Sequence, residues 1–205
     1  MPPEPHRMTP GWTLPADEAS RVMPSTSASP LHPTCLTPQD VPTYVTGDAT
    51  QPHGNGPKIL VHVCNDLGAW GRGFVLALSR RYPEPEAAYR HWISTRAMPF
   101  HLGAVQFVRV RSDLQVANLI GQRGVRRIGG RPPVRYSAIR AGLELVRVEA
   151  HVQGASVHMP RLGAGLAGGD WRVIEQIIRE ELCVVGVAVT VYDLPSPPLP
   201  RSSTR

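Results

Sequence analysis

Residues 159–171 read Met159-Pro-Arg-Leu-Gly-Ala-Gly-Leu-Ala-Gly-Gly-Asp-Trp171 and form a glycine-rich junction between a strand-like run and a helix-like run. A second junction with the same neighbours, residues 64–73, reads Cys64-Asn-Asp-Leu-Gly-Ala-Trp-Gly-Arg-Gly73. Glycines let main-chain amides approach an anion closely, and the N-terminus of the following helix adds positive potential. One such loop is usually only a turn, but two at the carboxyl edge of one sheet indicate a phosphate-binding site.

The runs around these junctions alternate between strand-like and helix-like patterns. Runs rich in β-branched or aromatic residues predict strands, and apolar residues spaced three and four apart predict helices. In the last helix Val173, Ile174, Ile177 and Ile178 are expected to face inward. The order predicts an α/β fold in which helices cover a largely parallel sheet. The predicted strands are residues 43–46, 58–64, 103–110, 114–120, 155–160 and 187–194, and the predicted helices are residues 71–82, 84–96, 133–151 and 171–182.

The chain divides into one predicted domain and two predicted tails. Residues 1–42 contain ten prolines and few large apolar side chains, a composition that cannot bury enough surface to offset chain entropy. We therefore expect a disordered tail there, one domain over residues 43–194, and a second disordered tail over residues 195–205. No stretch approaches the roughly 18 apolar residues of a membrane span, and the N-terminus does not resemble a signal peptide. A cytoplasmic location without membrane contact is expected.

Cysteines and histidines give no sign of a metal site. The three cysteines, Cys35, Cys64 and Cys183, are odd in number and widely separated, which suits neither a disulfide framework nor a zinc site. We expect them to be reduced, with Cys64 and Cys183 in the core. His62 and His158 lie within strand-like runs and are expected in the core or just behind the site. No metal and no cofactor are predicted.

The net charge of +6 is carried mainly by arginine, since Lys58 is the only lysine. Arginine forks match phosphate oxygens, so an anionic ligand or nucleic acid is one interpretation of the arginine-rich segment at residues 123–135. A solvated loop is the other. No aromatic residue lies among these arginines, which disfavours a surface for single strands. The segment contains five arginines and no acid: Arg123, Arg126, Arg127, Arg131 and Arg135.

A dinucleotide-binding fingerprint competes with a simple phosphate loop. Gly163-Ala-Gly165-Leu-Ala-Gly168 matches the pattern, follows a predicted strand, and precedes a predicted helix. Asp193, at the end of the next strand, has about the position of a ribose-binding acid. Only twelve residues follow Asp193, so we do not expect a second half to hold a nicotinamide. Both interpretations predict a nucleotide ligand that contains a diphosphate.

Four separated motifs in this order resemble the macrodomain family over residues 43–194. They are Tyr44-Val-Thr-Gly-Asp48, His62-Val-Cys-Asn65 with residues 68–73, Ser156-Val-His-Met-Pro-Arg-Leu-Gly-Ala-Gly165, and Val191-Tyr-Asp-Leu194. Within the family, the likeness is greatest to the macrodomain of a chromatin-remodelling helicase and to the terminal ADP-ribose protein glycohydrolase type. The resemblance implies a three-layer α/β fold, with a six-stranded mixed sheet between helices and ADP-ribose lying across its edge.

The resemblance also implies roles for individual residues. Asp48 would hold the adenine amino group, and the main chain of Ala49 would contact the ligand. Asp48 alone could equally be a turn residue, Asn65 a strand-end cap, and Asp170 a helix cap. The first loop would face the distal ribose through Asn65, Asp66, Gly71 and Gly73, and Arg72 in the same loop is expected to contact the ligand. The second loop would wrap the diphosphate through Gly163, Ala164, Gly165, Leu166, Ala167 and Gly168. Further ligand contacts are expected from Gln122, Arg161 and Tyr192.

Catalysis is where this sequence departs from the resemblance. The glycohydrolase type uses a lysine nucleophile and an assisting aspartate, and those positions are Gln122 and Ala167 here. An amide is not an amine nucleophile and a methyl group transfers no proton, so a lysyl mechanism is excluded. Hydrolysis would need water polarised by the ligand's own phosphate and oriented by Asn65 or Asp66, with a carboxylate as the leaving group.

Three hypotheses about function follow. The first is a hydrolase that removes ADP-ribose from acidic side chains of ADP-ribosylated proteins. The second is a non-catalytic reader of ADP-ribose or poly-ADP-ribose. The third is a small nucleotide-dependent oxidoreductase. ADP-ribose and ADP-ribosylated proteins are the expected partners under the first two.

Overall fold

The computed structural model describes residues 40–96 and 99–195. The described residues all belong to one compact unit, the second along the chain. The predicted tails, except for a few residues at their inner ends, lie outside the described residues. No helix in the described ranges has the length and apolar character needed to cross a membrane.

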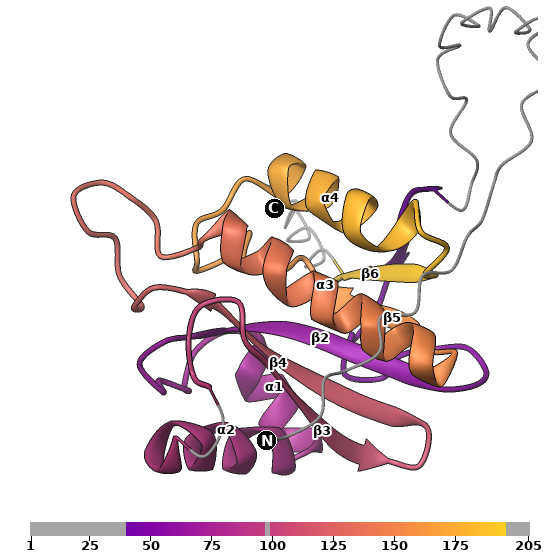
Figure 1. The fold of residues 1–205 in the computed structure, drawn as a ribbon, viewed down its shortest axis with the longest axis horizontal. Coiled ribbons are helices and arrows are strands. Elements are labelled where there is room, and N and C mark those ends of the chain that lie inside the picture. Colours follow the sequence, from indigo (N-terminus) through magenta and orange to yellow (C-terminus); the bar gives the residue numbers. More distant parts are fainter. Residues whose placement is uncertain (1–39, 97–98, 196–205) are drawn as a thin grey trace, which may run out of the picture. The chain divides into compact units, whose positions relative to one another are not determined.

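A six-stranded mixed sheet forms the middle of this second unit (Figure 1). Its strands lie in the order β1-β6-β5-β2-β4-β3. All neighbouring strands are parallel except β3 and β4, which are antiparallel. The predicted six-stranded mixed α/β sheet is confirmed. The strands are β1 (Thr43–Thr46), β2 (Lys58–Asn65), β3 (Val105–Arg111), β4 (Leu114–Gln122), β5 (Ser156–Pro160) and β6 (Val189–Asp193).

Two helices cover each face of the sheet (Figure 1). α1 (Phe74–Arg81) and α2 (Glu84–Thr95) pack on one face, and α3 (Tyr136–Gln153) and α4 (Trp171–Ile178) pack on the other. The apolar stripe predicted for α3 is buried against the sheet, which fixes the side of the sheet that this helix covers. That stripe consists of Ile139, Leu143, Val146 and Ala150.

The helix predicted over residues 171–182 differs from the structure in two ways. Its α-helical part ends at Ile178, and a π-helical turn continues to Cys183. Val173 is 40 % exposed, so the prediction that it faces inward is wrong. At 3.6 residues per turn the buried side of α4 holds Ile174, Ile177 and Ile178, and Val173 lies off it. Asp170 caps the helix by accepting a hydrogen bond from the amide of Arg172 at 2.9 Å.

The predicted burial of Cys64, Cys183, His62 and His158 is confirmed, and Cys35 lies outside the described residues. Cys64 and Cys183 are free thiols in the core. His62 and His158 are also buried, and burial lowers the pKa of each to about 4. Both imidazoles are therefore neutral at pH 7 and neither contributes a positive charge to anion binding.

Candidate functional site

Two loops meet at the carboxyl edge of the sheet. β2 continues into residues 66–73 before α1, and β5 continues into residues 161–170 before α4. Because β2 and β5 are parallel neighbours, their carboxyl ends lie next to each other. The loops are close enough to touch, since a Cβ added at Gly73 would lie 3.3 Å from Cδ1 of Leu166.

A continuous cleft lies between these loops. One cavity of about 360 Å³ is bounded by the first loop and the end of β4. A second of about 240 Å³ is bounded by the second loop and the start of α1. Nucleotide-sized ligands occupy cavities of about 300–1,000 Å³, so the cleft has room for one. The two cavities share Val63, Arg72, Val75, Gln122 and Leu166.

Most of the predicted site residues line this cleft, but some do not. Those in the lining are Asn65, Gly71, Arg72, Gly73, Gln122, Arg161, Gly163, Gly165, Leu166 and Ala167. Those outside it are Asp48, Ala49, Asp66, Ala164, Gly168 and Tyr192. The role of each stays a prediction, and the geometry below shows what each side chain contacts.

Unpartnered main-chain amides are the most informative feature of the lining. Eight amides in the two loops donate no hydrogen bond to any described residue. Most of these residues are exposed, so water can satisfy the amides, and an anionic acceptor that enters the cavity could replace that water. Arg72 adds a guanidinium that forms no ion pair with a described residue. The amides belong to Trp70, Gly71, Arg72, Gly73, Gly163, Gly165, Leu166 and Ala167.

The second loop keeps its shape through its own main chain. The amide of Gly169 donates to the carbonyl of Gly163 at 2.9 Å, and the amide of Gly168 donates to that of Gly165 at 2.9 Å. Gly163 and Gly168 have φ of 62° and 68°, a left-handed conformation that favours glycine. Main-chain hydrogen bonds and glycine conformations therefore preorganise the loop.

Asn65 shapes the first loop. Its Oδ1 accepts from the amides of Leu67 and Ala69, both at 3.0 Å, and its Nδ2 donates to the carbonyl of Ala69 at 2.6 Å. The side chain is 7 % exposed. Of the alternatives considered from sequence, the strand-end cap matches these contacts. Both polar atoms of the Asn65 side chain already bond to the first loop, so Asn65 would have to keep these bonds while it oriented a water molecule.

Asp66 faces away from the cleft. Its carboxylate accepts from the amide of Gly124 at 2.6 Å, and its own amide donates to the carbonyl of Gln122 at 2.9 Å. It borders a different cavity, together with Arg96 and Arg123. Asp66 therefore connects the first loop to the segment after β4 by hydrogen bonds. It would influence a reacting water molecule only by positioning that loop.

Trp70 is a cleft residue that the sequence analysis did not single out. Its Nε1 donates to Oγ of Ser79 at 2.7 Å, and its ring lies 5.4 Å from Tyr89 and 5.3 Å from His62 between centroids. Nε2 of His62 in turn donates to Oδ1 of Asn118 at 2.6 Å. The sequence did hold a signal for Trp70, because a large aromatic residue inside a glycine-rich loop needs other side chains to pack against.

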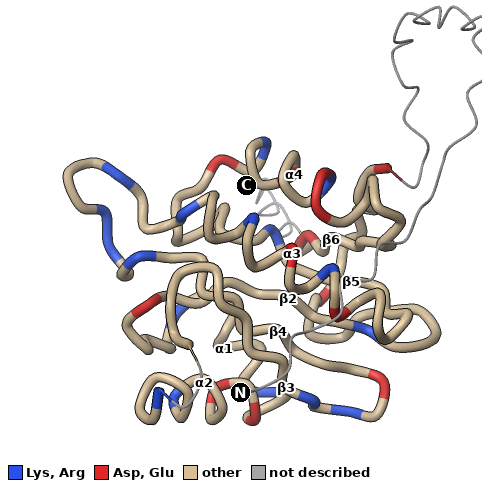
Figure 2. The backbone as a smooth tube through the Cα atoms, viewed as in Figure 1, with Lys and Arg blue, Asp and Glu red and all other residues tan. Residues whose placement is uncertain are grey.

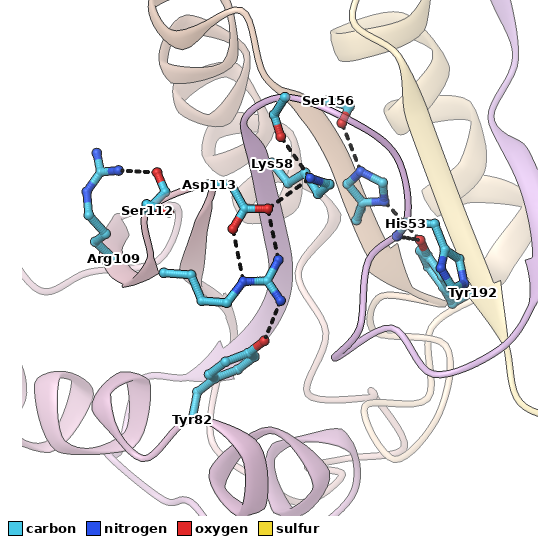
Figure 3. Close-up of polar contacts among 11 residues, drawn as sticks. His53, Lys58, Tyr82, Arg109, Ser112, Asp113, Ser156 and Tyr192 are labelled. Atoms are coloured by element: carbon cyan, nitrogen blue, oxygen red, sulfur yellow. Dashed lines mark hydrogen bonds and ion pairs between the residues drawn. The ribbon is translucent and has the colours of Figure 1, made fainter.

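The predicted adenine-site residues lie at the ends of β1 and β6. Asp48 accepts from the amide of Thr50 at 2.9 Å and from its hydroxyl at 2.8 Å. Partial burial raises the pKa of Asp48, but these hydrogen bonds outweigh it and the pKa is lowered. Ala49 is buried. Tyr192 is also buried, and its hydroxyl accepts from the amide of His53 at 2.9 Å (Figure 3).

Comparisons with known proteins show which family the chain belongs to. A macrodomain protein from Streptomyces coelicolor is 54 % identical, with a TM-score of 0.67, and the match covers 74 % of this chain and 97 % of that chain. The chain belongs to the macrodomain family. No protein-family model matches it.

Two curated relatives of this macrodomain are larger proteins. Chromodomain-helicase-DNA-binding protein 1-like of Mus musculus is 30 % identical over 74 % of this chain and 18 % of its own length. DNA ADP-ribosyl glycohydrolase of Mycobacterium tuberculosis is 30 % identical over 65 % of this chain and 36 % of its own length. The chain thus spans well under half of each of these relatives.

No lysine of the described macrodomain can reach the cleft. Lys58 starts β2, and its Nζ donates to the carbonyl of Gly56 at 2.8 Å and to Asp113 at 3.1 Å (Figure 3). It is 3 % exposed. The eight residues of β2 separate it from the loop edge, roughly 23 Å at 3.3 Å per residue. At the cleft, Gln122 lines both cavities and Ala167 is buried.

The cleft is also without acidic side chains. No aspartate or glutamate is among the described residues that line either cavity. The ionisable lining groups besides arginine are His62 and Cys64, and burial lowers the pKa of the first and raises that of the second. Neither is a strong general acid or base at pH 7. The polar side chains left are the carboxamides of Asn65 and Gln122.

Arg161 closes one end of the cleft. It forms a two-point ion pair with Asp193, at 2.5 and 2.7 Å. Its guanidinium lies 5.2 Å from the ring centre of Tyr44 and 5.0 Å from that of Trp171. Asp193 was the proposed ribose acid of the dinucleotide interpretation, and its carboxylate is already engaged by Arg161. That interpretation has no support from the site.

Proposed function

We propose that this macrodomain binds ADP-ribose in the cleft and hydrolyses the bond between ADP-ribose and an acidic side chain of a modified protein. The observation that carries the proposal is the set of eight unpartnered amides around one cavity system. A diphosphate offers several acceptor oxygens with negative charge, and hydrogen bonds to charged groups are stronger than those between neutral groups. Arg72, between the two cavities, is placed to add a charge-assisted contact.

The proposed orientation follows the family resemblance. The distal ribose lies at the first loop, near Asn65 and Gln122, and the diphosphate lies on the second loop. The adenosine end extends past Arg161 toward Asp48. Since Asp48 lies outside the lining of both cavities, we propose that its contact with adenine forms at the rim of the cleft.

Direct attack by water is the mechanism that these residues permit. The side chain of Gln122 makes no hydrogen bond to a described residue, so its carboxamide is free to orient a water molecule at the distal ribose. A phosphate oxygen of the ligand is the nearest anionic group available to polarise that water. Asn65 and Asp66 hold the loops that fix this geometry, and we retain both as predicted contributors to the rate.

The leaving group decides which substrates can react. Without a carboxylic acid in the lining, the departing group receives little proton assistance from the protein. A carboxylate leaves easily without it, whereas the guanidine released from an arginine-linked substrate is far more basic. We therefore propose ester-linked ADP-ribose on glutamate or aspartate as the substrate. The name of the mycobacterial relative supports hydrolysis of an ADP-ribosyl bond in general, on a DNA acceptor in that protein.

The decisive experiment compares two substrates under the same conditions. The full chain is incubated at pH 7 with protein carrying ester-linked ADP-ribose and with protein carrying arginine-linked ADP-ribose, and free ADP-ribose is measured. We expect release from the ester only, with no borohydride-trapped adduct. Gln122→Ala should slow release about a hundredfold. Gln176→Ala, an exposed glutamine on α4, is the matched control and should not change the rate.

The second candidate function is a reader that binds ADP-ribose without hydrolysing it. The absence of acidic side chains from the described lining favours it, because most hydrolytic sites include one. Tight binding of ester-linked ADP-ribose, with release no faster than in buffer, would replace the hydrolase with the reader.

A further inference from the structure

A long hairpin loop rich in arginine lies beside the cleft. We call residues 123–135 the basic hairpin; they connect β4 to α3 (Figure 1). Its base is closed by a bond from the amide of Arg123 to the carbonyl of Pro133 at 2.9 Å. At its tip, Ile128 and Arg131 exchange two main-chain bonds of 3.1 Å. Gly129 and Gly130 both have positive φ, as a tight two-residue hairpin turn requires.

The basic hairpin carries positive charge that no acid neutralises. Figure 2 shows blue segments and no red along it. Arg123, Arg126, Arg127 and Arg131 are exposed, and none forms an ion pair with a described residue. By contrast, several exposed arginines elsewhere in the described ranges pair with carboxylates, as Arg140 does with two glutamates. Unpaired arginine forks in this density are suited to an external polyanion.

The basic hairpin is continuous with the rim of the cleft. Val125, between the first two arginines, lines the cleft together with Gln122. On the other side, a Cβ added at Gly168 of the second loop would lie 3.1 Å from Nη2 of Arg127. A polyanion held by the basic hairpin would therefore run past the opening of the cleft.

We propose that the basic hairpin binds the phosphate backbone of double-stranded nucleic acid. A duplex offers a dense array of phosphates, and the exposed arginines on both limbs of the basic hairpin can contact phosphates on either side of a groove. The basic hairpin has no aromatic side chain on which unpaired bases could stack. Anionic membranes fit less well, because its exposed apolar side chains are limited to Val125 and Ile128. The surface is independent of hydrolysis in the cleft.

The test measures duplex binding by fluorescence polarisation with the full chain and a labelled 20-base-pair duplex at several salt concentrations. We expect binding that weakens steeply with salt, as counterion release requires. The double variant Arg126→Ala with Arg131→Ala should weaken binding roughly tenfold or more at low salt and lower the salt slope by about two. Neither of these side chains forms a hydrogen bond or ion pair with a described residue, so the fold should be unaffected.

The matched control is Arg80→Ala with Arg109→Ala, two exposed arginines on α1 and β3. It removes the same charge and should leave the salt slope unchanged. Absence of duplex binding, or equal loss in both double variants, would overturn the proposal. Binding to single strands or to phosphatidylserine vesicles in preference to the duplex would also overturn it. ADP-ribose affinity, measured in parallel, should be the same in all variants.

Discussion

Gly165→Glu should weaken ADP-ribose binding without destabilising the fold, so this one substitution tests the role of the second loop in binding. Gly165 lines the cleft, yet a Cβ added there meets no protein atom within 4 Å, and its φ is not positive. The protein should therefore accept a side chain at this position at a cost within about 0.5 kcal/mol. The added carboxylate would stand in the space that we assign to the diphosphate.

The expected loss of affinity can be worked out from two effects. A carboxylate and a phosphate 4 Å apart repel by about 1 kcal/mol in water and by more where water is excluded. Obstructing the amides removes hydrogen bonds worth about 1.5–3 kcal/mol each to a charged acceptor. Together these amount to at least about 3 kcal/mol, a loss of roughly a hundredfold or more in ADP-ribose affinity by calorimetry. Gly165→Gln supplies the same bulk without charge and should lose less.

Gly163→Ala is the contrasting variant. Gly163 has a φ of 62°, and an added Cβ would lie 3.1 Å from Cγ2 of Val134. The left-handed conformation costs a non-glycine residue about 1–2 kcal/mol, which lowers Tm by about 2–8 °C in a domain of this size. Gly165→Glu should keep the Tm and lose the ligand. A folded Gly165→Glu protein that binds ADP-ribose normally would refute the assignment of the second loop to the diphosphate.

Three further predictions concern other parts of the domain. Asp48→Ala should weaken ADP-ribose binding by about 1–3 kcal/mol in calorimetry, and unchanged affinity would make Asp48 a turn residue only. Asn118→Ala removes the buried partner of His62 and should cost about 1–3 kcal/mol in chemical unfolding, so full stability would contradict the bond. Because burial lowers the pKa of His62 and His158 from 6.5 to about 4, the unfolded chain binds more protons in that range. The contribution of these histidines to the free energy of unfolding should therefore be fully present above pH 6.5 and fall on acidification toward pH 4, by up to about 1.4 kcal/mol per pH unit for each histidine. A free energy of unfolding in urea that does not change from pH 7 to pH 5 would contradict this.

The sequence was informative about helices and strands because the side that each one buries leaves a regular pattern of apolar residues. The run that became β2 is almost entirely buried, so its apolar residues from Ile59 to Cys64, interrupted only by His62, were sufficient to predict a buried strand. The stripe on α3 was equally clear. Val173 was predicted wrongly because apolar character alone does not say which side of a short helix faces the sheet. The π-helical turn after Ile178 depends on packing and leaves no local signal.

The site was predictable in outline but not in its side-chain contacts. Glycines at both junctions indicated the loops, since positive φ and close approach depend on local sequence. The contact between Asp66 and Gly124 joins positions 58 residues apart, and no local pattern reveals it. Likewise, the lack of acidic lining groups follows from which segments meet at the cleft. The sequence supplied the candidates, and the tertiary structure shows which of them line the cleft.

The chemistry of the cleft follows from where its charged groups have been placed. Lys58 is held at the amino end of β2 by Asp113, and Asp193 is held at the rim by Arg161. The polar groups left in the described lining include main-chain amides, the unpaired Arg72, the carboxamides of Asn65 and Gln122, and the neutral side chains of His62 and Cys64. Such a lining suits an anionic ligand and offers little proton assistance to a leaving group, so under the proposed hydrolase function the reactivity of the substrate bond would determine which modifications are removed.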